Sequence, residues 1–314
     1  MEIVHYSVLK NEVVSFLKPD RPGELFVDCT TGEGGHSEAL LSAYPDIELT
    51  CLDTDAGILG IAQQRLEPFH GRVSFCNTWF NNYFENYPAD MRRPDKILFD
   101  LGISTYHYEK SGRGFSFRKD EPLSMQLGSG MEVSAGDMVN NYPADKLADI
   151  IYDFGEERYS RRIARAIEEY RENKTIETSA ELAEIIYKAV PEVYRHGKIH
   201  PATRTFQALR IAVNGELARL PKALGKALEV LNPGGVIAVI TFHSLEDRIV
   251  KQFFKEKNRN CICPDDAPRC VCGGNNRVVD ILTKKPVCPS EQEVGENSPS
   301  RSAKLRVVRK VVRS

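Results

Sequence analysis

Short apolar runs alternate with segments of helical periodicity in residues 25–100. The apolar runs predict four strands, at 25–28, 47–53, 73–76 and 96–100. Helices are predicted between them at 37–41 and 56–66, where apolar residues recur at helical spacing. Because parallel neighbouring strands need crossover helices, this alternation predicts an α/β fold with a mostly parallel sheet.

The alternation breaks between Tyr106 and His200. Prolines and glycines mark loops in the first half of this stretch, at Pro122, Gly128, Gly130 and Pro143. Two amphipathic helices are predicted after these loops, at 160–171 and 179–189. We therefore predict a mostly helical domain that is inserted into the sheet domain.

The α/β pattern resumes after the insertion. Helices are predicted at 203–220, 222–231 and 244–254, a strand buried on both faces at 236–241, and two late strands that pair with each other at 278–283 and 304–312. Ser244 is the expected N-cap of the last of these helices. The predicted division is residues 1–105 as the first part of the core, 106–200 as a helical insertion for substrate recognition, and 201–314 as the second part of the core with a basic C-terminal segment.

Composition favours a folded cytoplasmic protein. Hydrophobic residues make up 41% and aromatic residues 9% of the 314 residues, which is typical of globular chains and not of disordered ones. No apolar run approaches the roughly 18 residues that a membrane span needs, and the first residues lack the pattern of an export signal. We therefore expect a cytoplasmic location, no membrane partner and no disulfides among the eight cysteines.

The positions of the charged residues are more informative than the net charge. The formal net charge of −2 disfavours nucleic-acid binding by bulk electrostatics. Residues 301–314 nevertheless carry six cations and no acid, and further basic segments lie at 158–162 and 204–210. Each of these segments fits either a local basic surface or a solvated helix face and charged tail.

A glycine-rich turn lies between the first strand and the first helix. Residues 28–35 follow the pattern Asp-x-x-x-Gly-x-Gly-Gly, which lets a nucleotide approach the backbone and meet N–H groups at the helix N-terminus. Asp53 ends the second strand, where a carboxylate can accept hydrogen bonds from ribose hydroxyls. An acid there suits S-adenosylmethionine and NAD equally, but Ser37 replaces the third glycine of the dinucleotide fingerprint and so disfavours NAD.

A further acid, Asp100, ends the fourth strand and is followed by a glycine. Open α/β sheets bind ligands at the carboxyl ends of their strands, so Asp100 is expected to face the same crevice as the glycine-rich turn. Its carboxylate can hold the amino group of a methionine moiety or accept a hydrogen bond from an exocyclic amine. The sequence does not choose between these two roles.

Polar residues gather at 200–210 and after the fifth strand. Arg204, Gln207 and Arg210 recur at three-residue spacing, so one helix face can present them to a phosphate or a base edge. His243 is either catalytic or structural. The segment that begins at Arg113 interleaves aromatic and basic residues, which fits either base stacking or a packed loop.

Four cysteines offer thiols for a tetrahedral metal site, at Cys261, Cys263, Cys270 and Cys272. They form two Cys-x-Cys pairs, whereas structural zinc sites generally place two to four residues between paired ligands. This spacing counts against a metal, and we expect none.

Taken together, these motifs resemble the MraW/RsmH family, bacterial methyltransferases of small-subunit ribosomal RNA. The matching strings run nearly end to end: His5–Leu9, Gly32–Ser37, Asp100–Ser104, Arg113–Phe117, Tyr152–Glu157, His200–Arg210, Phe242–Arg248 and Arg301–Arg306. The resemblance implies a class I S-adenosylmethionine-dependent methyltransferase sheet, Rossmann-like, with an inserted helical domain. It also implies methylation of N4 of a cytidine in the decoding region of 16S ribosomal RNA, with that RNA or the assembled small subunit as partner.

The resemblance also implies a set of site residues. The cofactor contacts would be Gly34, Gly35, His36, Asp53, Phe80, Asp100 and His107. Asp100 is in addition the candidate catalytic acceptor for the cytosine amine. The candidate substrate contacts are Arg113, Arg204, Gln207, Arg210 and His243.

The chain departs from the family pattern in three places. Glu33 and Thr54 stand where the family usually has arginine, and residues 122–128 read Pro-Leu-Ser-Met-Gln-Leu-Gly in place of Pro-Leu-Asp-Met-Arg-Met-Asp. If this loop positions the cytidine, its Ser124, Gln126 and Gly128 bear on activity while cofactor binding survives. Two alternatives therefore stay open: a catalytically impaired ribosome-assembly factor of the same fold, and an NAD-linked oxidoreductase.

Overall fold

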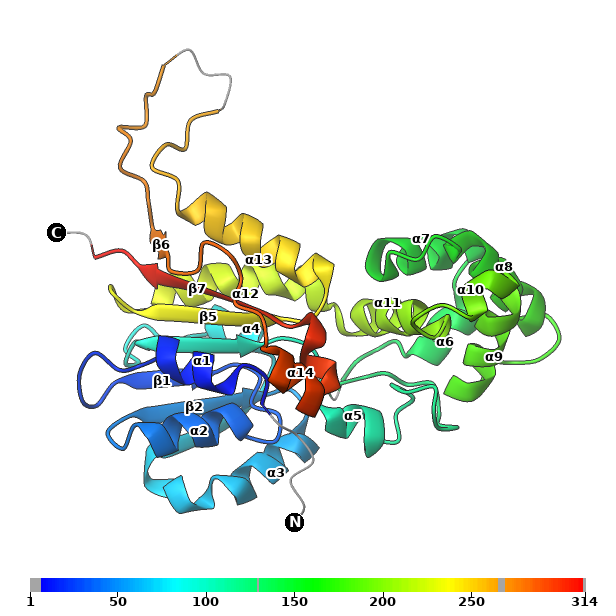
Figure 1. The fold of residues 1–314 in the computed structure, drawn as a ribbon, viewed down its shortest axis with the longest axis horizontal. Helices are drawn as coiled ribbons and strands as arrows, with labels where there is room; N and C mark the ends of the chain where they lie inside the picture. Colours follow the sequence, from blue (N-terminus) through cyan, green and yellow to red (C-terminus); the bar gives the residue numbers. More distant parts are fainter. Residues whose placement is uncertain (1–6, 129, 265–268, 313–314) are drawn as a thin grey trace. The chain divides into compact units, whose positions relative to one another are not determined.

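The computed structural model describes residues 7–128, 130–264 and 269–312, which fall into two compact units. The first unit takes the chain up to residue 103 and again from residue 217, and the second takes residues 104–216 (Figure 1). The core of the first unit is therefore discontinuous in sequence. Among the described residues, no helix is both long and apolar enough to span a membrane.

One seven-stranded sheet forms the centre of the first unit, in the order β3-β2-β1-β4-β5-β7-β6. The strands are β1 (Leu25–Asp28), β2 (Glu48–Asp53), β3 (Val73–Asn77), β4 (Lys96–Asp100), β5 (Val236–Thr241), β6 (Val279–Ile281) and β7 (Lys304–Lys310). The first five pair in parallel, while β7 runs antiparallel to both β5 and β6. The predicted α/β fold with a mostly parallel sheet is confirmed, and so is the pairing of the two late strands.

Helices cover both faces of this sheet (Figure 1). They are α1 (Lys10–Phe16), α2 (Gly35–Ala43), α3 (Ala56–Arg65), α4 (Phe80–Glu85), α12 (Glu216–Val230), α13 (Ser244–Lys257) and α14 (Glu291–Glu296), with short 3-10 turns at Glu67–Arg72 and Ser298–Ser302. Strand β5 shows why both faces are apolar. Its Ile237 and Val239 join the core under α12 and α13, whereas Ala238 and Ile240 join the core under α1 and α2.

The second unit is helical. Its helices are α5 (Thr105–Glu109), α6 (Ala135–Asn141), α7 (Ala144–Gly155), α8 (Ser160–Arg171), α9 (Ser179–Ala189), α10 (Glu192–Arg195) and α11 (Ala202–Asn214). We expected the insertion to end at residue 200, but α11 packs against α7 and the unit extends to residue 216. Gly155 permits this packing, because a Cβ there would lie 2.5 Å from the carbonyl oxygen of Arg204.

Two predicted helix boundaries were wrong. The helix expected at 203–220 is interrupted at Gly215, which adopts a left-handed conformation (φ 60°) and ends α11. The N-cap of α13 is His243 and not Ser244, and its ring pairs with Glu246 in a capping box. In both cases, the periodicity of hydrophobic residues does not fix the end of the helix to a single residue.

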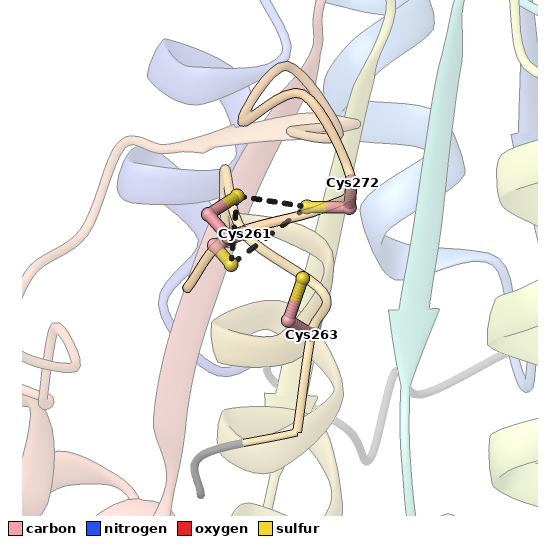
Figure 2. A group of neighbouring side chains, drawn as sticks. Cys261, Cys263 and Cys272 are labelled. Atoms are coloured by element: carbon pink, nitrogen blue, oxygen red, sulfur yellow. Dashed lines mark hydrogen bonds between the residues drawn. The ribbon is translucent and has the colours of Figure 1, made fainter. Parts of the chain in front are cut away.

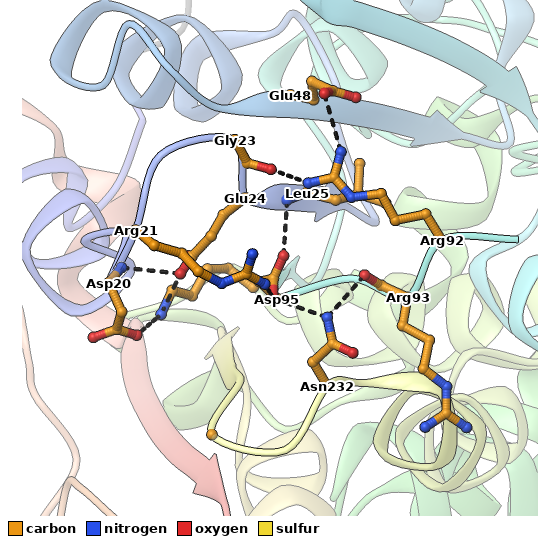
Figure 3. Close-up of polar contacts among 12 residues, drawn as sticks. Asp20, Arg21, Gly23, Glu24, Leu25, Glu48, Arg92, Arg93, Asp95 and Asn232 are labelled. Carbon is orange, nitrogen blue, oxygen red and sulfur yellow. Dashed lines mark hydrogen bonds and ion pairs between the residues drawn. The ribbon is translucent and has the colours of Figure 1, made fainter.

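Charged side chains are buried at the amino-terminal edge of the sheet (Figure 3). The Lys96 side chain is 1% exposed, and its Nζ lies 2.6 Å from Asp20 Oδ2 and 3.6 Å from Glu24 Oε2. Asp95 accepts hydrogen bonds there from the Leu25 backbone N–H and the Asn232 side chain. This network closes the end of the sheet opposite to the one at which the strand-end acids lie.

Candidate active site

Polar residues end each of the five parallel strands. They are Asp28, Asp53, Asn77, Asp100 and Thr241, at the ends of β1 to β5. Because these strands run in parallel, their carboxyl ends meet at one edge of the sheet. Ligands of open α/β sheets bind at this edge, so the fold itself indicates where a site would form.

The glycine-rich turn after β1 depends on backbone conformations that glycine adopts readily. Gly32 and Gly34 have positive φ angles of 53° and 84°, and Gly34 is the N-cap of α2. A Cβ on Gly35 would collide with Ser7 Oγ. The turn thus brings the N-terminus of α2, where nucleotide cofactors can meet backbone N–H groups, close to the carboxyl end of β1, and Ser7 fills the space beside Gly35.

Asp53 is held in place by the backbone around it. Its Oδ2 accepts a hydrogen bond of 2.9 Å from the Gly32 N–H, and its Oδ1 accepts one of 2.9 Å from the Asp55 N–H. Each carboxylate oxygen has a further lone pair with which it can accept a ribose hydroxyl. The structure thus joins two predicted cofactor contacts, the glycine-rich turn and the acid at the end of β2.

His36 and Asp100 meet at the centre of the edge. His36 Nε2 lies 3.5 Å from Asp100 Oδ2, and the two side chains are only 6% and 15% exposed. Within the described part of the chain, Asp100 Oδ1 and both ring nitrogens of His36 are buried without a hydrogen-bond partner. Buried polar atoms are normally satisfied, so these three atoms are suited to receiving a bound ligand.

A second carboxylate, Asp28, is buried close enough to interact electrostatically with this pair. It is fully buried and accepts a hydrogen bond of 2.7 Å from Ser37 Oγ. Burial raises the pKa of Asp28 to about 6, although the Ser37 bond acts in the opposite direction. Burial lowers the pKa of His36, but the Asp100 and Asp28 carboxylates raise it more, so that its net pKa lies above the ordinary value.

Ser37 also bears on the choice between cofactors. Its side chain is fully buried, with Oγ 2.7 Å from Asp28 and 3.4 Å from Cys51 Sγ. The third glycine of a dinucleotide fingerprint allows close packing of helix on strand, and here a hydrogen-bonded side chain takes that place. The geometry adds to the sequence argument against NAD.

The remaining predicted cofactor contacts lie in different units. Phe80 begins α4 in the first unit and packs edge-on against Phe99, with ring centroids 5.6 Å apart, directly before Asp100. His107 lies on α5 in the second unit, where it is buried against Phe115 at 5.5 Å. The first unit thus brings together the glycine-rich turn, His36, Asp53, Phe80 and Asp100.

Arg113 binds the loop in which the chain departs from the family pattern. Its Nη1 donates to the carbonyl oxygens of Gln126 and Leu127 at 2.9 and 3.2 Å. Asn214 fixes the same loop, because its side chain bonds to the Leu127 N–H and the Met125 carbonyl. The loop is thus held through its backbone, and the altered side chains take part as well, because Gln126 Nε2 donates to the Met131 carbonyl at 3.0 Å and Ser124 Oγ lies 3.3 Å from Gln126 Oε1.

Arg204, Gln207 and Arg210 all project from α11, but each is engaged within the second unit. Arg204 and Gln207 donate to the carbonyls of Glu156 and Phe154 at the C-terminal end of α7. Arg210 forms two hydrogen bonds, of 2.9 and 3.0 Å, with the Glu216 carboxylate. Hydrogen bonds within the second unit thus explain why these three residues are polar. That they contact the substrate stays a prediction.

His243 has a defined structural role. Its Nδ1 accepts from the Glu246 N–H at 3.5 Å, and its Nε2 lies 3.1 Å from Glu246 Oε1. Glu246 in turn accepts the Phe242 N–H at 2.9 Å. Substrate contact by His243 likewise stays a prediction.

The sequence analysis did not single out several residues of the edge. Thr30 Oγ1 accepts the Asp100 N–H at 2.7 Å and so fixes the end of β4. Trp79, beside Phe80, stacks under the Arg219 guanidinium at 4.3 Å. Thr30 lies two residues after the end of the buried strand β1, and this position was the available signal. The Trp79 contact joins segments far apart in the sequence and had no local signal.

The whole chain matches known proteins. The model of the MraW methylase family matches residues 2–311. Proteins named "Ribosomal RNA small subunit methyltransferase H" are similar over nearly the full length. The one from Treponema denticola is 56% identical and covers 99% of this chain and 98% of its own. Those from Borrelia turicatae and Dehalococcoides mccartyi are 47% and 46% identical, covering 98% and 93% of this chain and 98% and 82% of their own.

Proposed function

This chain belongs to the MraW methylase family, and we propose that it transfers a methyl group from S-adenosylmethionine to N4 of a cytidine in the decoding region of 16S ribosomal RNA. The observation that carries the proposal is the pair of buried, unsatisfied side chains at the carboxyl edge, His36 and Asp100, next to the glycine-rich turn. The names of the relatives support the RNA substrate.

The edge residues fit the cofactor by their chemistry. Asp53 is placed to accept the ribose hydroxyls, because two backbone N–H groups orient its carboxylate. Gly34 and Gly35 present the backbone N–H groups of the α2 N-terminus to the ligand, and Phe80 offers an apolar wall. When bound, S-adenosylmethionine supplies an electrophilic methyl group on its sulfonium.

Asp100 acts on the nucleophile in this proposal. Its buried Oδ1 accepts a hydrogen bond from the cytosine amine, which holds the N4 lone pair toward the methyl group. As the new C–N bond forms and the C–S bond breaks, the amine loses one proton to Asp100 or to water. His36 orients Asp100 through the 3.5 Å contact, and no covalent adduct with the enzyme is needed.

The second unit is proposed to recognise the RNA. Phe117 stacks on His200 with ring centroids 4.5 Å apart, and Arg195 lies over the neighbouring Tyr187. Such aromatic and guanidinium groups stack on unpaired bases in single-stranded RNA. His107, Arg113, Arg204, Gln207, Arg210 and His243 remain the predicted cofactor and substrate contacts outside the central edge.

The direct test uses the purified full chain, methyl-labelled S-adenosylmethionine and small ribosomal subunits that lack the modification. After digestion of the RNA, we expect the label in N4-methylcytidine. Naked 16S RNA in a parallel reaction shows whether free RNA or the assembled subunit is the substrate. Label in another nucleoside would contradict the proposed target.

The same reaction separates the alternatives. A ribosome-assembly factor that has lost catalysis would bind S-adenosylmethionine and the subunit but transfer nothing. An NAD-linked enzyme would bind NAD, and NAD would compete with S-adenosylmethionine. We expect transfer at a measurable rate and no competition by NAD.

A further inference from the structure

Four cysteines gather in the long segment that connects α13 to β6. Cys261 and Cys263 lie on its outgoing arm, and Cys270 and Cys272 lie on its returning arm. All four sulfur atoms lie within 4.8 Å of one another. Figure 2 shows the labelled side chains Cys261, Cys263 and Cys272 pointing toward one another from the two arms.

The distances between the sulfurs fit a tetrahedral metal site. Cys270 Sγ lies 3.6 Å from both Cys261 Sγ and Cys272 Sγ, and the distance between the last two is 3.7 Å. A zinc–sulfur bond of about 2.3 Å gives an edge of about 3.8 Å for a regular tetrahedron of sulfurs. The arrangement thus has the size of a Zn(Cys)4 centre, although each pair has only one intervening residue.

Backbone N–H groups support the sulfurs. The Ile262 N–H donates to Cys272 Sγ at 3.4 Å, and the Val271 N–H donates to Cys263 Sγ at 3.3 Å. Each of these bonds crosses from one arm to the other. Hydrogen bonds to thiolate sulfur orient metal ligands and stabilise their negative charge.

Disulfides do not explain the arrangement. A disulfide needs an S–S distance of about 2.05 Å, whereas the three distances of 3.6, 3.6 and 3.7 Å favour no pair over another. All four thiols are free in the structure.

Apolar packing does not explain it either. Ile262 and Val271, which lie between the paired cysteines, are 64% and 79% exposed. The base of the segment is closed by polar bonds, from the Val278 N–H to the Lys257 carbonyl and from the Asn276 N–H to the Asn260 carbonyl. A segment with so little buried apolar surface needs another cross-link to hold four sulfurs together.

We propose that Cys261, Cys263, Cys270 and Cys272 bind one structural zinc ion. All four ligands come from the protein, so the site has no open position and is structural and not catalytic. The ion would tie the two arms together beyond their hydrogen-bonded base. This inference is independent of the methylation reaction.

Metal content is the first measurement. The full chain is produced in zinc-supplemented medium, freed of any affinity tag and dialysed without chelator, and zinc and iron are then measured by mass spectrometry. We expect one zinc per chain in the wild type and in Cys288→Ser, an exposed cysteine outside the cluster. The double variant Cys261→Ser/Cys272→Ser should hold at least tenfold less.

A second measurement needs no variant. After chelation, the wild-type chain is titrated with cobalt(II), and we expect the visible ligand-field and thiolate charge-transfer bands of a tetrahedral sulfur site at one equivalent. Under denaturing conditions with chelator, all eight cysteines should react as free thiols. Four free thiols, iron in place of zinc, or no metal together with no cobalt–thiolate band would each overturn the proposal.

Discussion

For single residues, the candidate site depends on Asp100 and His36, which contact each other at 3.5 Å and have further buried polar atoms without a hydrogen bond among the described residues. Asp100 Oδ1 and the His36 nitrogens are buried without a hydrogen bond among the described residues, whereas Asp28 and Thr30 are hydrogen-bonded to their neighbours. Asp53 is oriented by two backbone N–H groups and can still accept a hydrogen bond from a ligand. This division of roles leads to two predictions.

Asp100→Asn should lower kcat for methyl transfer about 100-fold or more, because an amide accepts a proton poorly and presents an N–H to the amine. Single-turnover methylation measures the rate, and titration calorimetry measures the dissociation constant for S-adenosylmethionine. Asp137→Asn, an exposed acid in the capping box of α6 in the second unit, is the control for the loss of one carboxylate. Near-normal transfer by Asp100→Asn would remove this residue from the mechanism.

Asp28→Asn should flatten the dependence of stability on pH. The folded pKa of Asp28 is about 6, above the ordinary value of 3.8, so the stability linked to its protonation is present below about pH 4 and is lost as pH rises to about 6. The shift corresponds to about 3 kcal/mol in the free energy of unfolding, as an order of magnitude. Urea unfolding at several pH values from 4 to 7 measures the free energy of unfolding of the wild type and of Asp28→Asn. If this free energy depends on pH equally in the two proteins, the raised pKa does not belong to Asp28.

At the scale of the elements, the turn between β1 and α2 is the most constrained part of the site. Its Gly34 has a φ of 84°. A Cβ added to Gly34 would lie 3.4 Å from the Cβ of Ala62 on α3. Residues with a side chain disfavour this left-handed conformation, and an added Cβ would already be in contact with α3. A substitution there should therefore alter the turn itself.

Gly34→Ala should destabilise the protein by about 1–2 kcal/mol and weaken S-adenosylmethionine binding, because the left-handed conformation carries that cost for an L-residue. Gly60→Ala on α3 is the matched control, since no atom lies within 4 Å of its added Cβ. It should stabilise the protein by up to about 1 kcal/mol and leave binding unchanged. Urea unfolding and calorimetry give both quantities, and equal effects of the two substitutions would contradict the prediction.

At the scale of the whole molecule, the two edges of the sheet in the first unit have different roles. The carboxyl edge holds the candidate site, and the amino edge holds the ion pairs of Lys96 with Asp20 and Glu24. The Glu24 side chain is only 3% exposed, so its charge depends on Lys96 for compensation. Stability and ligand binding should therefore respond to different substitutions.

Lys96→Met should lower the free energy of unfolding by about 3–5 kcal/mol, because it leaves the buried Glu24 carboxylate without its partner. The dissociation constant for S-adenosylmethionine should not change, since the substitution lies at the opposite edge. Lys226→Met is the control, because its pair with Glu229 is solvent-exposed and is worth less than about 1 kcal/mol. A Lys96→Met protein that keeps its stability but loses cofactor binding would show that this division is wrong.

The order of residues along the chain was sufficient to predict the sheet and the edge at which the site lies. Apolar runs, strand-end acids and the glycine-rich turn are local features, and the parallel pairing of strands brings Asp28, Asp53 and Asp100 to one edge wherever such a sheet forms. The strings from Gly32 to Ser37 and from Asp100 to Ser104 belong to this local information. They were enough to indicate the fold class and the cofactor.

Which polar residues form hydrogen bonds, and which segments pack together, became known from the three-dimensional structure. The α11 helix joins the second unit because Gly155 lets α7 approach it, and Arg204 and Gln207 then meet the carbonyls at the α7 C-terminus. The four cysteines converge because the two arms of one segment lie side by side, a fact that residue spacing did not contain. Contacts between distant segments depend on packing in three dimensions. The periodicity of hydrophobic residues reports only on neighbouring residues and so does not predict such contacts.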